Sequence, residues 1–215
     1  MAAQVVSRAA KILVCFALKA EAAALPPKIW SWRATVLITG IGRQNAGRSV
    51  RDFLASNSPQ RVVTCGFAGG LNPALAHGTV VFATDDAQLR EKLLGAGAKA
   101  AKFFCAARIA ITAVEKAQLR QSTGADVVEM ESEAIQALCR ERGIPCATVR
   151  VISDTANEDL PLDFNRLSNP DSSLNYGKLA LAVAKSPGKI PALLRLQKNS
   201  SFAAKQLAEV LVKIL

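Results

Sequence analysis

The sequence predicts a single α/β domain in which a mixed or mostly parallel sheet is covered by helices on both faces. The chain has 215 residues, 50% of them hydrophobic and 20% charged, which suits one domain with a sizeable core. Several predicted strands are apolar throughout rather than alternating, as in sheets that are buried on both faces. Helical segments separate some of these strands, which favours an α/β arrangement. We therefore expect one domain over 11–215, preceded by a short tail at 1–10.

The first four strands are predicted from short apolar runs that glycine or polar turns bound. They lie at 11–18, 33–39, 61–65 and 79–83. The third is expected to stop at the glycine-rich segment 66–70, and the fourth follows the turn signal His77-Gly78. Helices are expected at 45–54 and 85–94.

The second half of the chain continues with strands and helices. Strands are expected at 103–111, 127–130 and 146–153. Helices are expected at 113–121, 132–142, 174–185 and 190–215, the last with a break near Asn199. Thr112 is a suitable N-cap for the first of these helices, and Gly143 and Pro145 close the second. The polar segment 154–173 is expected to be a loop.

The last helix carries an apolar stripe, formed by Leu193, Leu196, Leu207, Val210, Leu211 and Ile214. Stripes of this kind mainly pack into a core or a dimer interface. A face that lies on a membrane surface is the alternative. The stripe therefore makes a homodimer and a peripheral membrane contact candidate assemblies.

The net charge narrows the choice of partners. The formal charge is +10, which attracts nucleic acid, anionic lipid or a phosphorylated ligand. Lysine and arginine are scattered, however, and few aromatic residues are available to stack on bases. We therefore expect a solvated basic surface without a specific nucleic-acid site.

Cysteine and histidine content argues against a metal or redox centre. The five cysteines are odd in number and widely spaced, and no CxxC motif occurs. His77 is the single histidine. The apolar run at 11–18 imitates a signal peptide, but Lys19 and Glu21 follow at once, so a buried strand is preferred. We expect a reducing, cytoplasmic location and no metal or other cofactor.

Carboxylates gather at the ends of predicted strands, where α/β proteins place their chemistry. Glu129 and Glu131 suit a ribose diol, because a carboxylate accepts two hydrogen bonds. Alternatively, Glu131 is an acid at a helix start. Asp154 ends a strand and is a candidate general acid if it is buried, or a turn cap. Glu21 is either a general base for water or part of a surface helix at 20–25, and pattern alone favours the surface helix.

Two glycine-rich segments also follow predicted strands, namely Gly40-Ile41-Gly42 and Gly66-Phe67-Ala68-Gly69-Gly70. Glycine there lets the backbone approach a ligand and present N–H groups to its oxygens. Neither segment matches the dinucleotide fingerprint or the Walker loop. Because turns after strands need glycine in any case, the pattern alone leaves a ligand site and a structural turn open.

Five segments, in order, resemble the nucleoside phosphorylase/nucleosidase superfamily, and in particular its methylthioadenosine/S-adenosylhomocysteine nucleosidases. They are Ala17-Leu-Lys-Ala-Glu21, Thr39-Gly-Ile-Gly42, Gly66-Phe-Ala-Gly-Gly-Leu71, Val128-Glu-Met-Glu131 and Val149-Arg-Val-Ile-Ser-Asp154. Each is moderately specific, and their shared order is a strong signal. The resemblance runs from about Lys11 to Asp159. It implies one α/β domain with a central, partly barrel-like mixed sheet, usually in a dimer, that cleaves an N-ribosidic bond.

The resemblance also implies roles for individual residues. Asp154 matches the acid that protonates the leaving purine, oriented by Ser153. Glu131 matches the carboxylate that holds ribose hydroxyls, and Met130 packs beside the sugar. Glu21 matches the base that activates water. The remaining substrate-binding positions are Glu129, whose role is less defined, and Ile41, Gly42, Phe67, Ala68 and Gly69.

The same resemblance favours water over phosphate as the nucleophile. Phe67 stands where phosphorylases of the family often carry a serine, and Glu21 brings negative charge where phosphate would approach. Phosphorolysis needs a cationic pocket instead. Because Arg43 could still meet phosphate, a phosphate-dependent purine nucleoside phosphorylase is the alternative. A non-catalytic nucleoside-binding protein is another.

The middle of the chain departs from the nucleosidases. The segment between Gly70 and Glu129 is shorter, and residues 105–111 lack a clear match for the aromatic ring that stacks on adenine. The compact middle, Met130-Glu131-Ser132 and residues 152–161 look like hopanoid-associated phosphorylase-like proteins, which are linked to removal of adenine from adenosylhopane. We therefore expect an adenine nucleoside with a variable 5′ group, of which adenosylhopane is one candidate.

Overall fold

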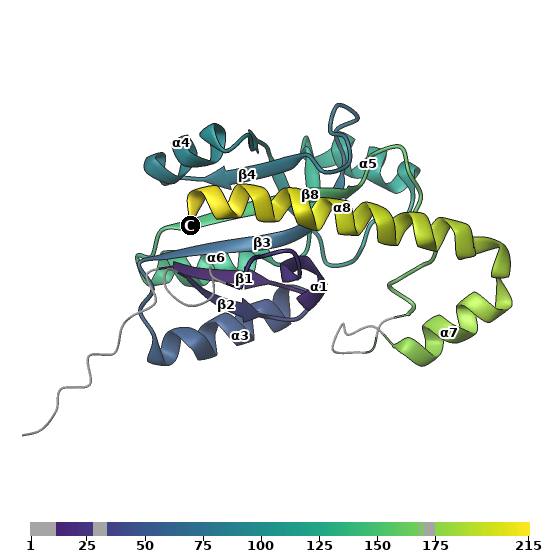
Figure 1. The fold of residues 1–215 in the computed structure, drawn as a ribbon, viewed down its shortest axis with the longest axis horizontal. Helices are drawn as coiled ribbons and strands as arrows, with labels where there is room; N and C mark the ends of the chain where they lie inside the picture. The colour runs from purple at the N-terminus through teal and green to yellow at the C-terminus, as the bar shows by residue number, and fades with distance from the viewer. Residues whose placement is uncertain (1–11, 28–33, 168, 170–174) are drawn as a thin grey trace, which may run out of the picture.

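The computed structural model describes residues 12–27, 34–167, 169 and 175–215, and a mixed sheet forms its core (Figure 1). The strands of the described chain are β1 (Ile12–Phe16), β2 (Ala34–Ile38), β3 (Arg61–Gly70), β4 (Val80–Thr84), β5 (Lys99–Ala100), β6 (Phe103–Cys105), β7 (Val127–Glu129) and β8 (Cys146–Asp154). The main order is β2-β1-β3-β8-β4-β5, and β6 and β7 join it through β3. The tail expected at 1–10 lies outside the described residues.

Strand directions make the sheet mixed, as the sequence predicts. β1 runs parallel to β2 and β3, β3 runs parallel to β8, and β4 and β7 are the antiparallel neighbours of β8 and β3. Because β5 and β6 are joined by residues 101–102, the path through β3, β8, β4 and β5 returns to β3 through β6 and β7. This return surrounds a small apolar cluster that includes Ala68, Val81 and Ile152. It is the partly barrel-like feature that the resemblance implies.

Helices cover both faces of the sheet. The helices of the described chain are α1 (Lys19–Ala22), α3 (Arg43–Ser56), α4 (Ala87–Gly95), α5 (Ala113–Thr123), α6 (Ser132–Glu141), α7 (Tyr176–Lys185) and α8 (Ile190–Ile214), with a 3₁₀ turn η1 (Pro187–Lys189) before α8. On β1, Leu13 and Cys15 pack with α3 and α6, whereas Val14 and Phe16 pack with α4 and α8. Successive strand side chains point to opposite faces, so burial of both faces requires the continuous apolar run that predicted β1.

Helix α8 is continuous, so the break expected near Asn199 is wrong. Its C-terminal half packs on the sheet and buries Leu207, Leu211 and Ile214. Leu193 and Leu196, from the same predicted stripe, are only partly buried. Core packing therefore explains the four stripe residues between 207 and 214 and not the two at 193 and 196. Within the described residues, no helix combines the length and apolar character needed to cross a membrane.

Two strands differ most from the prediction in where they end. β3 does not stop at Gly66, because residues 66–69 continue to pair with β8 across a register shift between Ala68 and Gly69. The strand expected over 103–111 ends at Cys105, after three residues that pair with β7. Glycine interrupted the apolar pattern of β3 in sequence, but pairing with a long neighbouring strand keeps the segment extended.

Candidate active site

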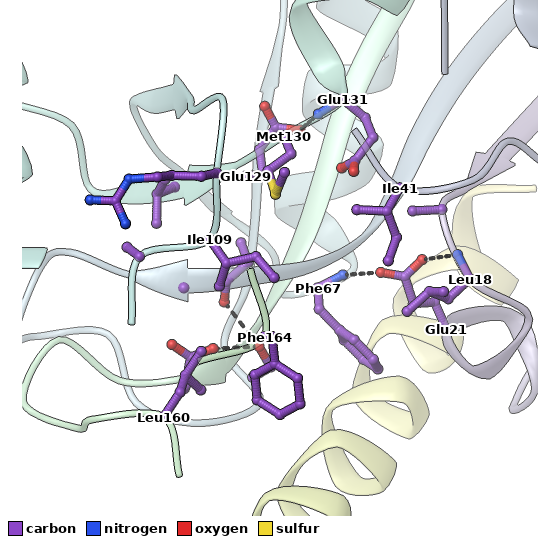
Figure 2. Close-up of a pocket in the computed structure, with 18 of the residues that line it drawn as sticks. Leu18, Glu21, Ile41, Phe67, Ile109, Glu129, Met130, Glu131, Leu160 and Phe164 are labelled. Atoms are coloured by element: carbon purple, nitrogen blue, oxygen red, sulfur yellow. Dashed lines mark hydrogen bonds between the residues drawn. The ribbon is translucent and has the colours of Figure 1, made fainter. Parts of the chain in front are cut away.

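Carboxylates from three separate segments converge on one cavity at the carboxyl ends of β3, β7 and β8 (Figure 2). The cavity volume is about 280 Å³, at the lower end of the usual range for ligand pockets. The predicted residues that line it are Glu21, Ile41, Phe67, Ala68, Gly69, Glu129, Met130, Glu131, Ser153 and Asp154. Gly42 does not line the cavity, but its N–H donates to Glu131 Oε1 at 2.7 Å. The structure therefore brings together residues that are more than a hundred positions apart in sequence.

Glu21 is buried at the cavity wall, so the preference for an exposed surface helix is wrong. Helix α1 is a single turn, and the Glu21 carboxylate folds back to accept from the Leu18 N–H at 2.8 Å. Its other oxygen accepts from the Phe67 N–H of β3 at 2.8 Å. Burial raises the pKa of Glu21, although these backbone hydrogen bonds oppose the rise.

Gly66 lets β3 pass close to that carboxylate. Its φ is +151°, and a Cβ added there would lie 2.6 Å from Glu21 Oε1. Both facts explain why a glycine stands at this point of the strand. The glycine-rich segment is thus a point of close approach within a strand, and not only the turn that its composition also allowed.

Glu129 is held by Arg150, a residue that the sequence analysis did not single out. Arg150 Nη2 lies 2.8 Å from Glu129 and 3.6 Å from Glu131, and the arginine is 1% exposed. Glu129 also accepts from the Glu131 N–H and from the N–H and hydroxyl of Ser132. Burial would raise the pKa of Glu129, but Arg150 and these hydrogen bonds outweigh it and lower the pKa. The sequence does contain a signal for this ion pair, because Arg150 lies within the apolar run of β8 and a buried charge needs a partner.

Glu131 has a different environment from Glu129, although the two are close in sequence. It is the N-cap residue of α6, as the helix-start interpretation predicts, and it also lines the cavity. Its role toward a ribose diol stays a prediction. Burial raises the pKa of Glu131 to about 7, against an opposing effect of Arg150 and with support from the charge of Glu129. The site therefore pairs a carboxylate that stays ionised with one that titrates near neutrality.

Asp154 is fixed from two sides. The Ser153 hydroxyl donates to Oδ1 at 2.8 Å, and Lys116 Nζ lies 2.5 Å from Oδ2. Lys116 projects from α5, is fully buried, and also donates to the carbonyls of Thr155 and Glu158 at 2.8 and 2.9 Å. Asp154 is thus part of a buried ion pair and not a simple turn cap. Nothing in the sequence distinguishes Lys116 from the other charged residues of α5.

Apolar side chains form the rest of the cavity wall. Ile109, Leu160 and Phe164 line it from two loops, and Leu196 lines it from α8. Figure 2 shows Leu160 and Phe164 on the side of the cavity opposite Glu131. Phe164 brings an aromatic ring to the cavity wall from the loop after β8, whereas residues 105–111 contain no aromatic side chain.

Comparison with known families gives an independent view of the chain. The sequence model of the family described as the phosphorylase superfamily matches residues 27–108 and 101–185. The aminodeoxyfutalosine nucleosidase of Campylobacter jejuni is 27% identical over 158 residues, which are 58% of this chain and 69% of the relative. The 5′-methylthioadenosine/S-adenosylhomocysteine nucleosidase of Shewanella sp. strain W3-18-1 is 26% identical over 162 residues, 59% of this chain and 70% of the relative.

Solved structures share the fold over nearly the whole chain. The Campylobacter jejuni 5′-methylthioadenosine/S-adenosylhomocysteine nucleosidase has a TM-score of 0.70 at 18% identity, with 95% of this chain and 97% of that chain covered. The futalosine hydrolase of Helicobacter pylori has a TM-score of 0.66 at 16% identity, with 94% and 97% covered. At such identities the match concerns the fold, and it confirms the predicted single α/β domain with a central mixed sheet.

Proposed function

The chain belongs to the phosphorylase superfamily, and on that premise we propose that it is a nucleosidase that hydrolyses the N-ribosidic bond of a 5′-substituted adenine nucleoside. The observation that carries the proposal is the convergence of Glu21, Glu131 and Asp154 on one cavity. Nucleosidases among the relatives support the same class of reaction.

Asp154 is the proposed general acid. In the reacting complex its carboxyl group carries a proton, which passes to N7 of adenine while the bond between C1′ and N9 breaks. Adenine then leaves as a neutral base and not as an anion, and Asp154 returns to the carboxylate that pairs with Lys116. Ser153 and Lys116 hold the carboxyl group in one orientation and stabilise the charge that remains on it. Lys116 is a positioning residue in this scheme, since it acts through Asp154.

Glu131 is the proposed ligand of the ribose hydroxyls. An ionised carboxylate accepts hydrogen bonds from both hydroxyls of a diol, and the Gly42 N–H keeps one of its oxygens in place. Met130 and Ile41 also line the cavity and offer apolar contacts to the sugar. Glu129 is a positioning residue in this scheme, because its carboxylate already accepts hydrogen bonds from Arg150 and from the start of α6.

Glu21 is the proposed base. It takes a proton from the water that attacks C1′ as the ribosyl group gains positive charge, so the products are adenine and a free ribose derivative. A raised pKa suits a general base that works near neutral pH.

Water is favoured over phosphate because every cation described around the cavity already has a carboxylate partner. Arg150 pairs with Glu129, Lys116 pairs with Asp154, and Arg108 pairs with Glu115. Arg43, the candidate phosphate ligand of the sequence analysis, pairs with the exposed Glu133. Phe67 adds an apolar ring to the cavity wall.

The apolar residues of the cavity wall are an argument about the chemistry of the 5′ substituent. Leu160, Phe164 and Leu196 favour an apolar group, and the small cavity volume suits a nucleoside whose 5′ group extends outside. Adenosylhopane, with its large hydrocarbon 5′ group, remains our proposed substrate, and methylthioadenosine is the smaller apolar alternative.

Chromatographic detection of free adenine tests the function. The purified protein is incubated with methylthioadenosine, S-adenosylhomocysteine, aminodeoxyfutalosine and adenosylhopane, each with and without phosphate. We expect adenine and free ribose derivative independently of phosphate. Release only with phosphate would identify a phosphorylase, and binding without any release would identify a nucleoside-binding protein.

Location and assembly are secondary parts of the proposal. All five cysteines are free thiols in the structure, which supports a reducing compartment such as the cytoplasm. We also propose a homodimer. Cell fractionation and light scattering after size exclusion test these two points.

A further inference from the structure

The C-terminal arm, defined as residues 177–202, extends away from the sheet without a core of its own. It comprises most of α7, the turn η1 and the first half of α8. Figure 1 shows α7 and the beginning of α8 projecting beyond the rest of the fold. No side chain from 177 to 202 is buried. Packing among the described residues therefore does not account for the arm.

The arm nevertheless carries large aliphatic side chains. Leu181 is 55% exposed, Ile190 is 41% exposed and Leu194 is 60% exposed, and Leu179, Val183 and Leu193 are only partly covered. Scattered apolar residues are normal on a protein surface, but a concentration of them on one projecting element marks an interaction site. Among the residues that the structure describes, none covers these side chains fully, so an apolar partner for them has to be sought elsewhere.

Cations are interleaved with these aliphatic residues. Between 175 and 208 the charged residues are Lys178, Lys185, Lys189, Arg195, Lys198 and Lys205, and all of them are exposed. The same stretch contains no aspartate or glutamate. The first acidic residue after it is Glu209. A helical surface that combines aliphatic residues with cations alone is complementary to anionic lipid headgroups above an acyl layer.

Other occupants fit less well. A symmetric contact with a second copy through the arm would bring cations against cations, which opposes association. Single-stranded nucleic acid is bound through several aromatic side chains that stack on successive bases, whereas the arm has one aromatic residue, Phe202, and is otherwise lined by leucine, isoleucine and valine.

The arm also adjoins the cavity. Leu196 of α8 belongs to the arm and lines the cavity wall together with Leu160 and Phe164. A surface that holds the arm would therefore lie close to the apolar side of the substrate site.

We propose that the C-terminal arm docks on the surface of a bilayer that contains anionic lipid, and that docking brings the cavity close to that surface. The aliphatic side chains enter the interface, and the cations contact headgroup phosphates. The part of the inference that concerns delivery of a lipid-linked nucleoside rests on the proposed function. Docking itself does not depend on it.

Vesicle co-sedimentation tests the docking. We expect the full chain to sediment with vesicles of phosphatidylcholine and phosphatidylglycerol, to bind phosphatidylcholine alone much more weakly, and to be released by salt. Lys185, Lys189 and Arg195 are then changed to glutamate together. This variant is expected to lose at least about 100-fold in partitioning, because each of these cations contributes at the headgroup surface.

A matched variant separates the arm from net charge. Arg51, Lys92 and Lys99 are exposed on α3, α4 and β5, and changing all three to glutamate removes the same charge from other surfaces. This control is expected to keep most of the binding. Equal losses in the two variants, or no binding of the unaltered protein to anionic vesicles, would overturn the proposal.

Two further measurements distinguish docking on a membrane from association with a second copy, and they test the proposed function separately. Leu181→Ser with Leu194→Ser should weaken vesicle binding and leave the oligomeric state unchanged; loss of an oligomer instead would assign the arm to a second copy. Neither residue lines the cavity, so adenine release from water-soluble methylthioadenosine should persist. Vesicle binding without adenine release would contradict the proposed function and leave the docking proposal standing.

Discussion

Asp154 is a buried carboxyl group that two neighbouring side chains hold in one orientation. Oδ1 accepts from the Ser153 hydroxyl, and Oδ2 faces the Lys116 ammonium. Lys116 uses its other donors on the carbonyls of Thr155 and Glu158, so the cation is tied to the loop that follows β8. The proposed acid and its lysine therefore form one unit, and substitutions of the two are expected to have different consequences.

Asp154→Asn is expected to lower kcat for adenine release by at least about 100-fold and to change the Kd of the substrate little. The amide keeps the shape of the side chain but has no acidic proton to transfer to N7. Single-turnover adenine release and equilibrium binding measure the two effects. Asp52→Asn, on the exposed face of α3, is the control and should behave like the unaltered protein. Near-normal turnover of the Asp154 variant would exclude it as the acid.

Lys116→Met is expected to lower kcat for adenine nucleosides by about 10- to 100-fold, because Asp154 loses a charge-assisted hydrogen bond. A p-nitrophenyl riboside should be cleaved at nearly the unaltered rate, since its leaving group departs without a proton. Lys102→Met removes a lysine that also contacts α5, through the Thr123 carbonyl, but not Asp154, and serves as the control. Equal losses on both substrates would indicate a merely structural role.

The close approach of α1 to β3 positions Glu21, the proposed base. Glu21 reaches β3 because Gly66 has no side chain, and its hydrogen bond to the Phe67 N–H follows from that approach. A single-turn helix thus acquires a defined position by contact with the sheet rather than by its own propensity.

Gly66→Ala is expected to reduce kcat/KM by about 100-fold while the protein stays folded. The new methyl group would occupy the place of Glu21 Oε1, and displacement of a reacting group by about 1 Å costs about that factor. Steady-state kinetics and thermal unfolding measure the change. Gly95→Ala, at the end of α4 with no atom within 4 Å of the new Cβ, should leave the kinetics unchanged. Unaltered kinetics in the Gly66 variant would contradict the assignment of Glu21.

Elements were predicted well where the signal is local. The buried strands β1 and β8 follow from continuous apolar runs, and the start of α5 follows from Thr112, whose side chain accepts from the Glu115 N–H. The extension of β3 through its glycines was missed, because pairing with β8 and not local propensity keeps it extended. The two-residue strand β5 likewise exists through pairing with β4.

The burial of Glu131 makes the free energy of unfolding of the whole protein depend on pH. Its pKa rises from 4.5 to about 7 on folding, so the folded state favours the protonated form. The resulting stabilisation is fully present below pH 4.5 and is lost as pH rises through 7. At neutral pH and above, keeping this carboxylate ionised therefore costs folding free energy.

Glu131→Gln is expected to stabilise the protein above pH 7 by about 3 kcal/mol and to have little effect near pH 4.5, because glutamine mimics the protonated acid. Urea unfolding at both pH values measures this difference. Substrate binding should weaken at the same time. Glu133→Gln alters the exposed carboxylate in the first turn of α6 and should change stability little at either pH. A pH-independent effect of the Glu131 substitution would contradict the shift.

Apolar periodicity, helix caps and ordered motifs are local properties of the chain, so the sequence alone predicts the fold class, the superfamily and which carboxylates to test. The roles of Glu21, Glu131 and Asp154 stay predictions, although the structure brings all three to one cavity. The burial of Glu21, the pairing of Arg150 with Glu129 and the contact of Lys116 with Asp154 become visible only in the folded chain. Packing also divides the apolar stripe of α8, because its residues from 207 onward are core whereas Leu193 and Leu196 lie in the arm. Burial and charge pairing arise where segments distant in sequence pack together, and no local pattern records which segments will meet.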